Sequence, residues 1–227
     1  RSSSHQIFSY DIVAAAMGRQ IHISNYMHAA VVLGVDIARF GDDSTVFTIR
    51  QGLAVTYQKA YRHLDSMMVA SYIAECIEQK QVDAVFLDMG SIGAAVYDRL
   101  TRHLGYDNVT GIDFGGTAQA NKEYFNKCAE MWWDTLEWMK TGGCISDCKE
   151  LRDDLTGRQY GYDRFERKQL ESKKDMKARG LASCDYADSL CLTFAHPVQK
   201  KRQLERGRMQ HAGATSDNYE CNPFDFI

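Results

Sequence analysis

The chain has 227 residues, of which 44% are hydrophobic and 25% charged, with a formal net charge of −3 at pH 7. This composition supplies one large hydrophobic core, and no apolar run approaches the roughly 20 residues that span a bilayer. Seven cysteines at irregular spacings, without a CxxC pair, argue against a disulfide framework or zinc ribbon and favour a reducing compartment. A net charge near zero also excludes a uniformly basic nucleic-acid binder.

The first predicted elements form an antiparallel unit. Residues 11–20 have helical potential within a lead-in segment. Three strands are then expected, over residues 31–38, 44–50 and 53–61. Short turns at Gly41-Asp42-Asp43 and at Gln51-Gly52 separate them, and connections this short join antiparallel neighbours.

A crossover pattern follows the third strand. Apolar residues at helical spacing over 66–80 predict a helix, and the buried strand after it ends at Asp88, so this strand runs parallel to the first. The later elements are a helix over 93–105, a strand over 108–116, a helix over 126–143, a hairpin with a basic exit over 158–177 and a last helix over 183–195. We therefore expect an α/β fold with a mixed five-stranded sheet, three antiparallel strands then two parallel ones, flanked by helices and carrying an added hairpin.

Two carboxylates end neighbouring strands of this predicted sheet. Asp36 ends the first strand and Asp88 the fourth. Parallel pairing of these strands places both acids at one edge, on strands about 4.8 Å apart. Buried carboxylates this close repel each other unless a hard cation compensates them, and oxygen ligands suit Mg²⁺ or Mn²⁺. The sequence therefore predicts a metal site at this edge.

The last predicted helix offers the third acid. Asp185 and Asp188 stand three residues apart and project from one helical face, so either completes the cluster. Two divalent ions about 3.5–4 Å apart in such a site activate a water and stabilise the leaving oxygen of a phosphodiester. The predicted chemistry is phosphodiester hydrolysis.

Each acid also has a purely structural interpretation. Asp36 then caps the turn that contains Arg39, Asp88 caps the following helix, and Asp185 is only an N-cap. Asp43 is either a solvated turn residue or a further group that reaches the metal edge. A structural role for all three acids at once is the less expected outcome, given where they fall.

A run of basic residues before the third acid is the candidate nucleic-acid surface. Lys173 and Lys174 precede the third acid in the chain and are expected to contact a phosphate, the alternative being a solvated charged connection. The full set comprises Arg164, Arg167, Lys168, Lys173, Lys174, Lys177 and Arg179. Contact of this kind holds a DNA backbone without reading its bases.

Four stretches resemble one known family in the same order: LGVDIARFGDDSTVFTIRQG, DAVFLDMGSIGAAVYDRL, NKEYFNKCAEMWWDTLEWMKTG and LESKKDMKARGLASCDYADSLCLTFAHP. They are similar to the C-terminal nuclease domain of the large terminase subunit of tailed bacteriophages, an RNase H-like endonuclease. The resemblance covers most of residues 31–197. It implies an RNase H-like sheet with Asp36, Asp88 and Asp185 as catalytic, metal-binding acids. Cys184 replaces the family's usual proline before the last acid, which leaves Asp188 as a further candidate ligand.

The resemblance also implies a domain organisation. Full-length large terminases carry an N-terminal ATPase, but this chain has no G-x-x-x-x-G-K-[ST] loop. We therefore expect a lead-in or linker from a missing ATPase over 1–30, the nuclease domain over 31–198 and a polar tail over 199–227.

By the same resemblance, the expected function is endonucleolytic cleavage of concatemeric viral DNA during genome packaging, with Mg²⁺ or Mn²⁺ and two ions. The implied partners are double-stranded DNA, the ATPase domain of the same protein, the portal and the small terminase subunit, without a membrane. The implied location is the host bacterial cytoplasm and not the mature virion. Two alternatives stay open: a noncatalytic docking module of the packaging motor, and another RNase H-like nuclease such as a Holliday-junction resolvase.

Overall fold

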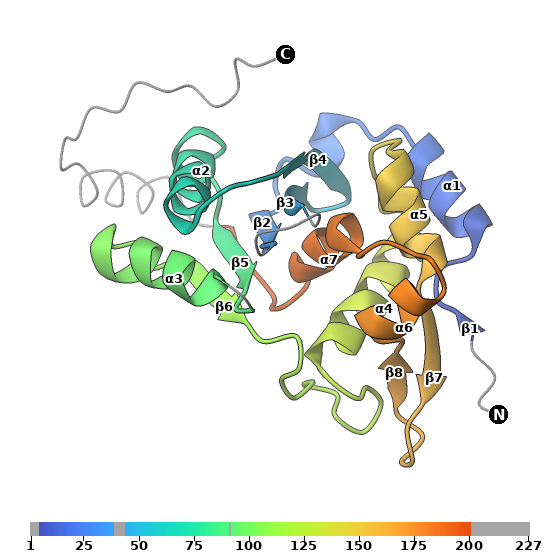
Figure 1. Ribbon diagram of the computed structural model, residues 1–227. Helices are drawn as coiled ribbons and strands as arrows, with labels where there is room; N and C mark the ends of the chain where they lie inside the picture. Colours follow the sequence, from blue (N-terminus) through green and yellow to red (C-terminus); the bar gives the residue numbers. More distant parts are fainter. Residues whose placement is uncertain (1–4, 39–43, 91, 201–227) are drawn as a thin grey trace.

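The computed structural model describes residues 5–38, 44–90 and 92–200. Its centre is a five-stranded sheet in the order β4-β3-β2-β5-β6 (Figure 1). The strands are β2 (Val31–Asp36), β3 (Thr45–Gln51), β4 (Ala54–Tyr61), β5 (Ala84–Asp88) and β6 (Val109–Ile112). Strands β2, β3 and β4 pair antiparallel, whereas β5 is parallel to β2 and β6 to β5. The predicted mixed sheet is thereby confirmed.

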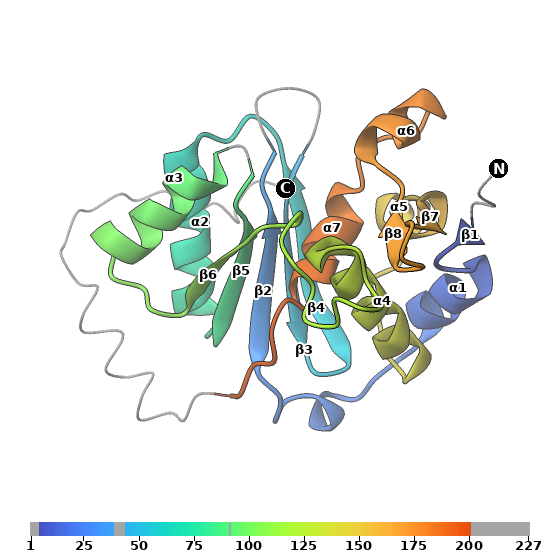
Figure 2. The same ribbon diagram turned by 90° about the horizontal axis from the view of Figure 1, so that it is seen from below.

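Helices cover both faces of the sheet (Figure 2). One face carries α2 (Ser66–Gln79) and α3 (Gly93–Asp98), the latter extended by a π-helical turn, Arg99–His103. The other carries α7 (Asp185–Leu192), which lies on β2 and β3, with α4 (Lys127–Lys140) packed on α7. The other helical segments are α1 (Tyr10–Gly18), the 3₁₀ turn Ile23–Asn25, α5 (Lys149–Gly157) and α6 (Lys173–Ala178).

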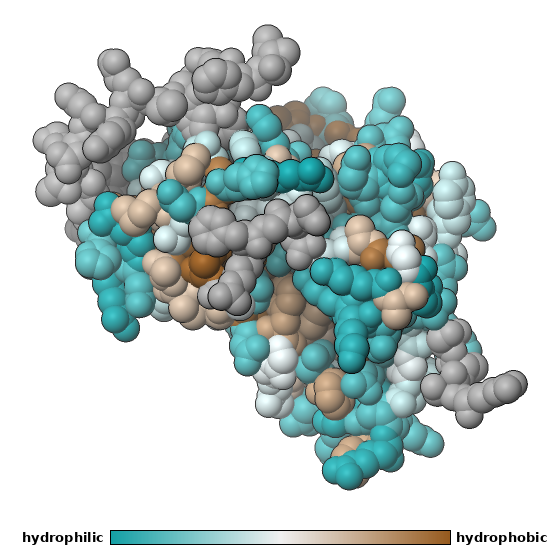
Figure 3. All heavy atoms as spheres, viewed as in Figure 1, coloured by the Kyte–Doolittle hydropathy of each residue, from teal (hydrophilic) through white to brown (hydrophobic). Residues whose placement is uncertain are grey.

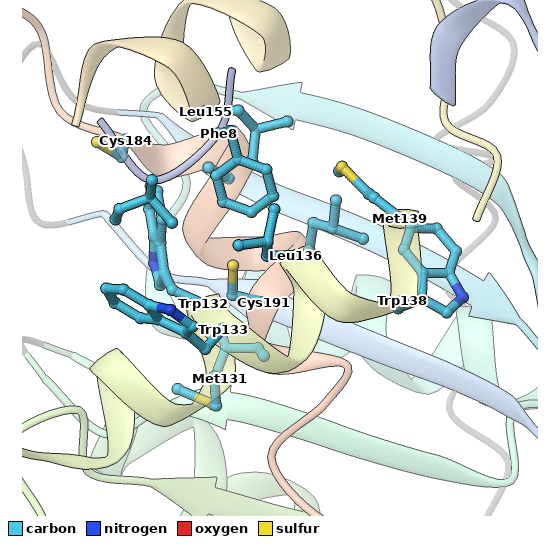
Figure 4. Close-up of a cluster of buried hydrophobic side chains, with 14 of the residues drawn as sticks. Phe8, Met131, Trp132, Trp133, Leu136, Trp138, Met139, Leu155, Cys184 and Cys191 are labelled. Carbon is cyan, nitrogen blue, oxygen red and sulfur yellow. The ribbon is translucent and has the colours of Figure 1, made fainter. Parts of the chain in front are cut away.

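A separate hydrophobic core lies on each face of the sheet. On the α2 side, Leu33 and Val35 of β2 pack among the apolar residues of α2, β5 and α3. On the other side, α4 buries the apolar stripe that its helical spacing predicts, with Trp132 as its largest fully buried side chain (Figure 4). The Trp132 ring meets Phe8 edge to face at 6.0 Å between centroids, a favourable aromatic geometry. Gly142, with φ of 117°, follows the end of α4.

A second, smaller sheet has the order β1-β7-β8. Strands β7 (Gln159–Tyr162) and β8 (Lys168–Leu170) form the added hairpin that the sequence predicts, and β1 (His5–Gln6) pairs with β7. Residues 5–18 therefore pack on the domain, although they lie within the segment predicted to be a linker. That an ATPase domain precedes them stays a prediction.

The surface of the molecule is largely polar on the face drawn in Figure 3. Exceptions on the β7–β8 hairpin are Tyr162 and Phe165, which are 51% and 62% exposed. Within the described ranges, no helix has the length and apolarity required to cross a bilayer.

Candidate functional site

Two acids end adjacent parallel strands. Asp36 is the last residue of β2 and Asp88 the last of β5. The register aligns Val35 with Leu87 one residue earlier, so both acids lie at the same edge of the sheet, as predicted. Asp36 is only 4% exposed, whereas Asp88 is half-buried and accepts the N–H of Gly90 at 3.1 Å.

Helix α7 reaches this edge because it packs very closely on β2. A Cβ at position 34 would lie 2.1 Å from the carbonyl oxygen of Ser189, so only glycine fits there without a shift of the backbone. The Ser189 hydroxyl also hydrogen-bonds the Thr48 hydroxyl on β3. These contacts hold α7 across the two strands.

Asp185 and Asp188 occupy the first turn of α7. Asp185 is 9% exposed, and its Oδ2 accepts the N–H of Ser44 at 2.9 Å, just before β3. Because Asp36 pairs with Val46 on β3, this bond places Asp185 at the same edge as the two strand-end acids. Together, Asp36, Asp88, Asp185 and Asp188 are called the acidic cluster below.

Asp188 has no exposed side-chain surface and is held by three other side chains. Its Oδ1 accepts the indole N–H of Trp132 at 2.9 Å and lies 3.2 Å from Nη1 of Arg158. Its Oδ2 lies 3.1 Å from Nζ of Lys173. Burial acts to raise the pKa of Asp188, but the two cations and the indole outweigh burial and lower it. Both oxygens of Asp188 face positive groups or a donor, an arrangement that favours its carboxylate form.

The charged forms of Asp36 and Asp88 are electrostatically unfavourable. Burial raises the pKa of Asp36 well above its ordinary value; Lys173 opposes this shift, while Asp188, Asp185 and Asp88 add to it. Burial also raises the pKa of Asp88, with a smaller contribution from Asp188. These couplings show that the four carboxylates share one electrostatic environment.

The chemistry of the acidic cluster fits a hard divalent cation. The donors are carboxylate oxygens, the ligands that Mg²⁺ and Mn²⁺ prefer. Oδ2 of Asp188 is buried with Nζ of Lys173 as its ion-pair partner at 3.1 Å, and a cation among these groups would relieve the repulsion that adds to the effect of burial on the pKa of Asp36. Across residues 5–38, 44–90 and 92–200, no three Asp, Glu, His or Cys side chains already form a group able to hold an ion.

The predicted DNA-binding residues are not equivalent in the structure. Arg167 pairs with Asp163 at 2.6 Å, Lys168 with Glu123 at 2.6 Å and Arg179 with Glu171 at 2.5 Å, so much of their charge is balanced locally. Arg164 lies over the Phe165 ring, 4.7 Å from its centroid, at the tip of the hairpin. Lys174 and Lys177 are exposed on α6. Only Lys173, among the seven described residues of this set, ion-pairs with the acidic cluster.

Three groups near the acids were not predicted as site residues. Arg158 and Trp132 hold Asp188, and Asp154 accepts two backbone N–H groups of α7. In the sequence, Arg158 is only a basic residue, Trp132 a core tryptophan and Asp154 one of two adjacent acids. Their contacts with α7 join residues far apart in the chain, so no local pattern reveals them. Asp43, predicted as an alternative contributor, lies outside the described residues.

Comparisons with solved structures give a consistent result. The chain has a TM-score of 0.68 and 17% identity with the nuclease domain of the large terminase subunit gp2 of bacterial virus Sf6, covering 85% of this chain and 99% of that one. A K428A mutant of the Sf6 domain with manganese gives a TM-score of 0.69 and 16% identity, covering 85% of this chain and 100% of that one. For the large terminase nuclease from thermophilic phage G20c with bound magnesium, the values are 0.55 and 15%, covering 74% and 82%.

No protein-family model and no curated protein sequence matches the chain. At these low identities, the likeness establishes the fold. It agrees with the observed strand order and with the mixed parallel and antiparallel pairing. The protein thus has the RNase H-like fold of the nuclease domains of phage large terminase subunits.

Proposed function

We propose that the protein is a metal-dependent DNA endonuclease that cleaves concatemeric viral DNA during genome packaging. The observation that carries the proposal is the acidic cluster: carboxylates from two strand ends and one helix, coupled electrostatically and incompletely neutralised. The terminase nuclease fold supports it. The manganese and magnesium in the structures of the Sf6 and G20c domains support Mg²⁺ or Mn²⁺ as the cofactor.

The proposed ligands are Asp36, Asp88 and Asp185, with Asp188 as the fourth candidate. When bound, two such ions would supply Lewis-acid stabilisation of a phosphodiester and a water that is nucleophilic at neutral pH. Lys173 would place a fixed ammonium beside the reacting phosphate, since it already lies next to Asp188 and acts on Asp36. Fixed charges of this kind stabilise negative charge as it develops.

DNA would reach the cluster from the side of α6. The side chain of Lys173 is 43% exposed although its ammonium contacts Asp188, and Lys174 adjoins it on the surface. Arg164 and Lys177 extend this polar surface. Arg167, Lys168 and Arg179 would contribute once a phosphate competes with their acids. We expect binding that tolerates any sequence and weakens steeply with salt.

The biological setting belongs to the same proposal. An ATPase domain of the same full-length protein, the portal and the small terminase subunit would bring the nuclease to double-stranded DNA in the cytoplasm of the bacterial host. The end of the nuclease domain at residue 198 belongs to the proposal too, as does a linker before residue 30, of which residues 5–18 pack on the domain. The nuclease itself would act without reading bases, so its partners would determine where and when the DNA is cut.

Supercoiled plasmid tests the activity directly. Purified protein is incubated with plasmid in Mg²⁺, Mn²⁺ or EDTA, beside Asp36→Asn and Asp185→Asn. Asp98→Asn is the control, because Asp98 is an exposed partner of Arg102 on α3. We expect nicking and linearisation with either metal, no cleavage in EDTA, and losses of at least about 100-fold in the two site variants, beyond the effect of typical outer-shell changes.

The other outcomes are also informative. Equal cleavage by wild type and both site variants would contradict the assigned acids. No cleavage under any condition would favour a noncatalytic docking module. Strong preference for a four-way junction over plasmid would favour a junction resolvase with the same fold.

A further inference from the structure

Four helices of the protein begin with the same local arrangement. Helices α1, α2, α4 and α6 have Ser9, Asp65, Asn126 and Ser172 at their N-caps, with ψ of 151°, 171°, 177° and 150°. In each, the side-chain oxygen of the cap accepts a backbone N–H of the first turn. This is the usual way in which the free N–H groups of a helix start are satisfied.

Helices α3, α5 and α7 begin without a side-chain hydrogen bond from the N-cap, and α7 is the one that carries half of the acidic cluster. Its N-cap is Cys184, with ψ of 44° and no side-chain hydrogen bond to the first turn. The thiol is buried and lies 3.5 Å from the sulfur of Met176 instead. A thiol is also a weak acceptor. The local chain therefore does not cap the helix that positions Asp185 and Asp188.

Asp154 supplies the missing acceptor from another helix. This residue lies on α5, and its Oδ2 accepts the N–H of Tyr186 at 2.9 Å and that of Ala187 at 3.2 Å. Tyr186 is held on its other side as well, because its carbonyl oxygen accepts Nε2 of Gln58 at 3.1 Å. The peptide groups between the two acids of α7 are thus fixed from two directions.

We propose that Asp154 is a positioning residue that caps α7 across the α5–α7 contact and thereby sets the directions of Asp185 and Asp188 for divalent-metal binding. This inference rests on the proposed nuclease site. Residues 186 and 187 lie between the two acids, so a shift of this turn moves both. Outer groups that orient ligands typically contribute 10- to 100-fold to metal affinity.

The position of the Asp154 oxygen, and not its charge, is what the proposed role requires. The N–H groups of Tyr186 and Ala187 need an acceptor oxygen at the place of Asp154 Oδ2, so a neutral side chain with the same shape is a suitable replacement. Asp154→Asn keeps an acceptor oxygen at the same distance from the backbone. Asp154→Glu keeps the carboxylate but displaces it by one methylene, and Asp154→Ala removes the acceptor.

Mn²⁺ binding to the complete chain, measured by isothermal titration calorimetry, tests the proposal. We expect affinity to fall about tenfold or more in Asp154→Ala and in Asp154→Glu, and to stay within about threefold of wild type in Asp154→Asn. The matched control is Asp153→Ala, the neighbouring residue on α5, whose side chain is 54% exposed and pairs with Lys149. This control should bind Mn²⁺ as wild type does.

Urea unfolding of each variant separates positioning from simple stabilisation. Asp154→Ala or Asp154→Glu with lower stability but wild-type Mn²⁺ affinity would overturn the proposal, as would equal weakening in Asp154→Asn and Asp154→Ala. If Asp154→Ala does not fold, the contrast between Asn and Glu still decides. Wild-type protein that binds no Mn²⁺ would overturn the proposed function and this inference together, a result distinct from the failure of this inference alone.

Discussion

Two buried groups of charged residues lie at opposite ends of β2 and differ in how far their charges are neutralised. Near the start of β2, beside a cavity of about 590 Å³, Lys127 and Glu130 of α4 are 2.7 Å apart with side chains only 9% and 7% exposed. Glu130 also accepts the N–H of Ala120 at 2.8 Å. Burial acts to raise its pKa, but Lys127 and the backbone donors lower it.

At the other end of β2, the acidic cluster is not balanced in this way. Lys173 and Arg158 face Asp188, yet the pKa of Asp36 stays raised by burial and by its acidic neighbours. A buried pair that serves stability is neutralised within the protein. The excess of acids at the second end is what a site for external cations requires.

The largest expected loss of stability comes from removing one partner of the buried Lys127–Glu130 pair. Lys127→Ala leaves Glu130 buried without its cation, which should lower the free energy of unfolding by about 3–5 kcal/mol. Lys140→Ala on the same helix is a closely matched control: its pair with Glu137 is also 2.7 Å long and three residues apart, but 45% and 62% exposed. That change should cost less than about 1 kcal/mol, as measured by urea unfolding. If Lys127→Ala and Lys140→Ala lowered the free energy of unfolding equally, the buried pair would not differ from the exposed one.

Divalent ions should stabilise the protein by binding at the acidic cluster. Mn²⁺ at 100 times its dissociation constant should add about 2.7 kcal/mol to the free energy of unfolding. Thermal unfolding with Mn²⁺ or EDTA measures this gain, which should disappear in Asp36→Asn and persist in Lys140→Ala. A gain that is the same in Asp36→Asn would place the bound ion elsewhere.

The close contact between α7 and β2 supports the acidic cluster. Gly34→Ala places a methyl group against the carbonyl of Ser189 and should cost about 1–3 kcal/mol in overpacking, with weaker Mn²⁺ binding. Gly161→Ala is the control, because a Cβ there meets nothing within 4 Å. Urea unfolding and Mn²⁺ calorimetry report the two effects. Wild-type stability in Gly34→Ala would show that α7 is free to move away from the sheet.

The smallest expected change in stability is a gain, from a substitution at the proposed metal ligand Asp36. The raised pKa of Asp36 means that the folded, metal-free protein holds a proton that the unfolded chain releases above its ordinary pKa of 3.8. Stability contributed by this residue therefore falls as pH rises. Asp36→Asn removes the penalty and should gain stability over wild type at pH 8 relative to pH 5, measured by urea unfolding in EDTA. The absence of any pH-dependent gain would show that Asp36 carries no such penalty.

Much of the fold and half of the acidic cluster follow from local patterns. Short turns impose antiparallel pairing on β2, β3 and β4, and the crossover through α2 imposes a parallel β5. These two rules are sufficient to place Asp36 and Asp88 at one edge of the sheet. The spacing of Asp185 and Asp188 and the family resemblance both predict that α7 supplies the third acid, but nothing local indicates that Gly34 would receive Ser189.

The remaining features depend on tertiary contacts that a sequence does not display. Asp153 and Asp154 are adjacent, yet one is an exposed partner of Lys149 and the other caps α7. Arg158 looks like one more member of a basic stretch, but it is buried against Asp188. The pairing of β1 with β7 joins segments about 150 residues apart. Such contacts decide which charges are solvated and which build the site.

The indole of Trp132 makes the acidic cluster observable by tryptophan fluorescence. Its N–H bonds directly to Asp188, and the guanidinium of Arg158 lies 4.8 Å from the centroid of its ring. A cation that reaches Asp188 changes the electric field at this chromophore, and with it the intensity and wavelength of tryptophan emission. In a background in which Trp133 and Trp138 are phenylalanine, the protein would report the occupancy of its own site by intrinsic fluorescence, without a label or a substrate.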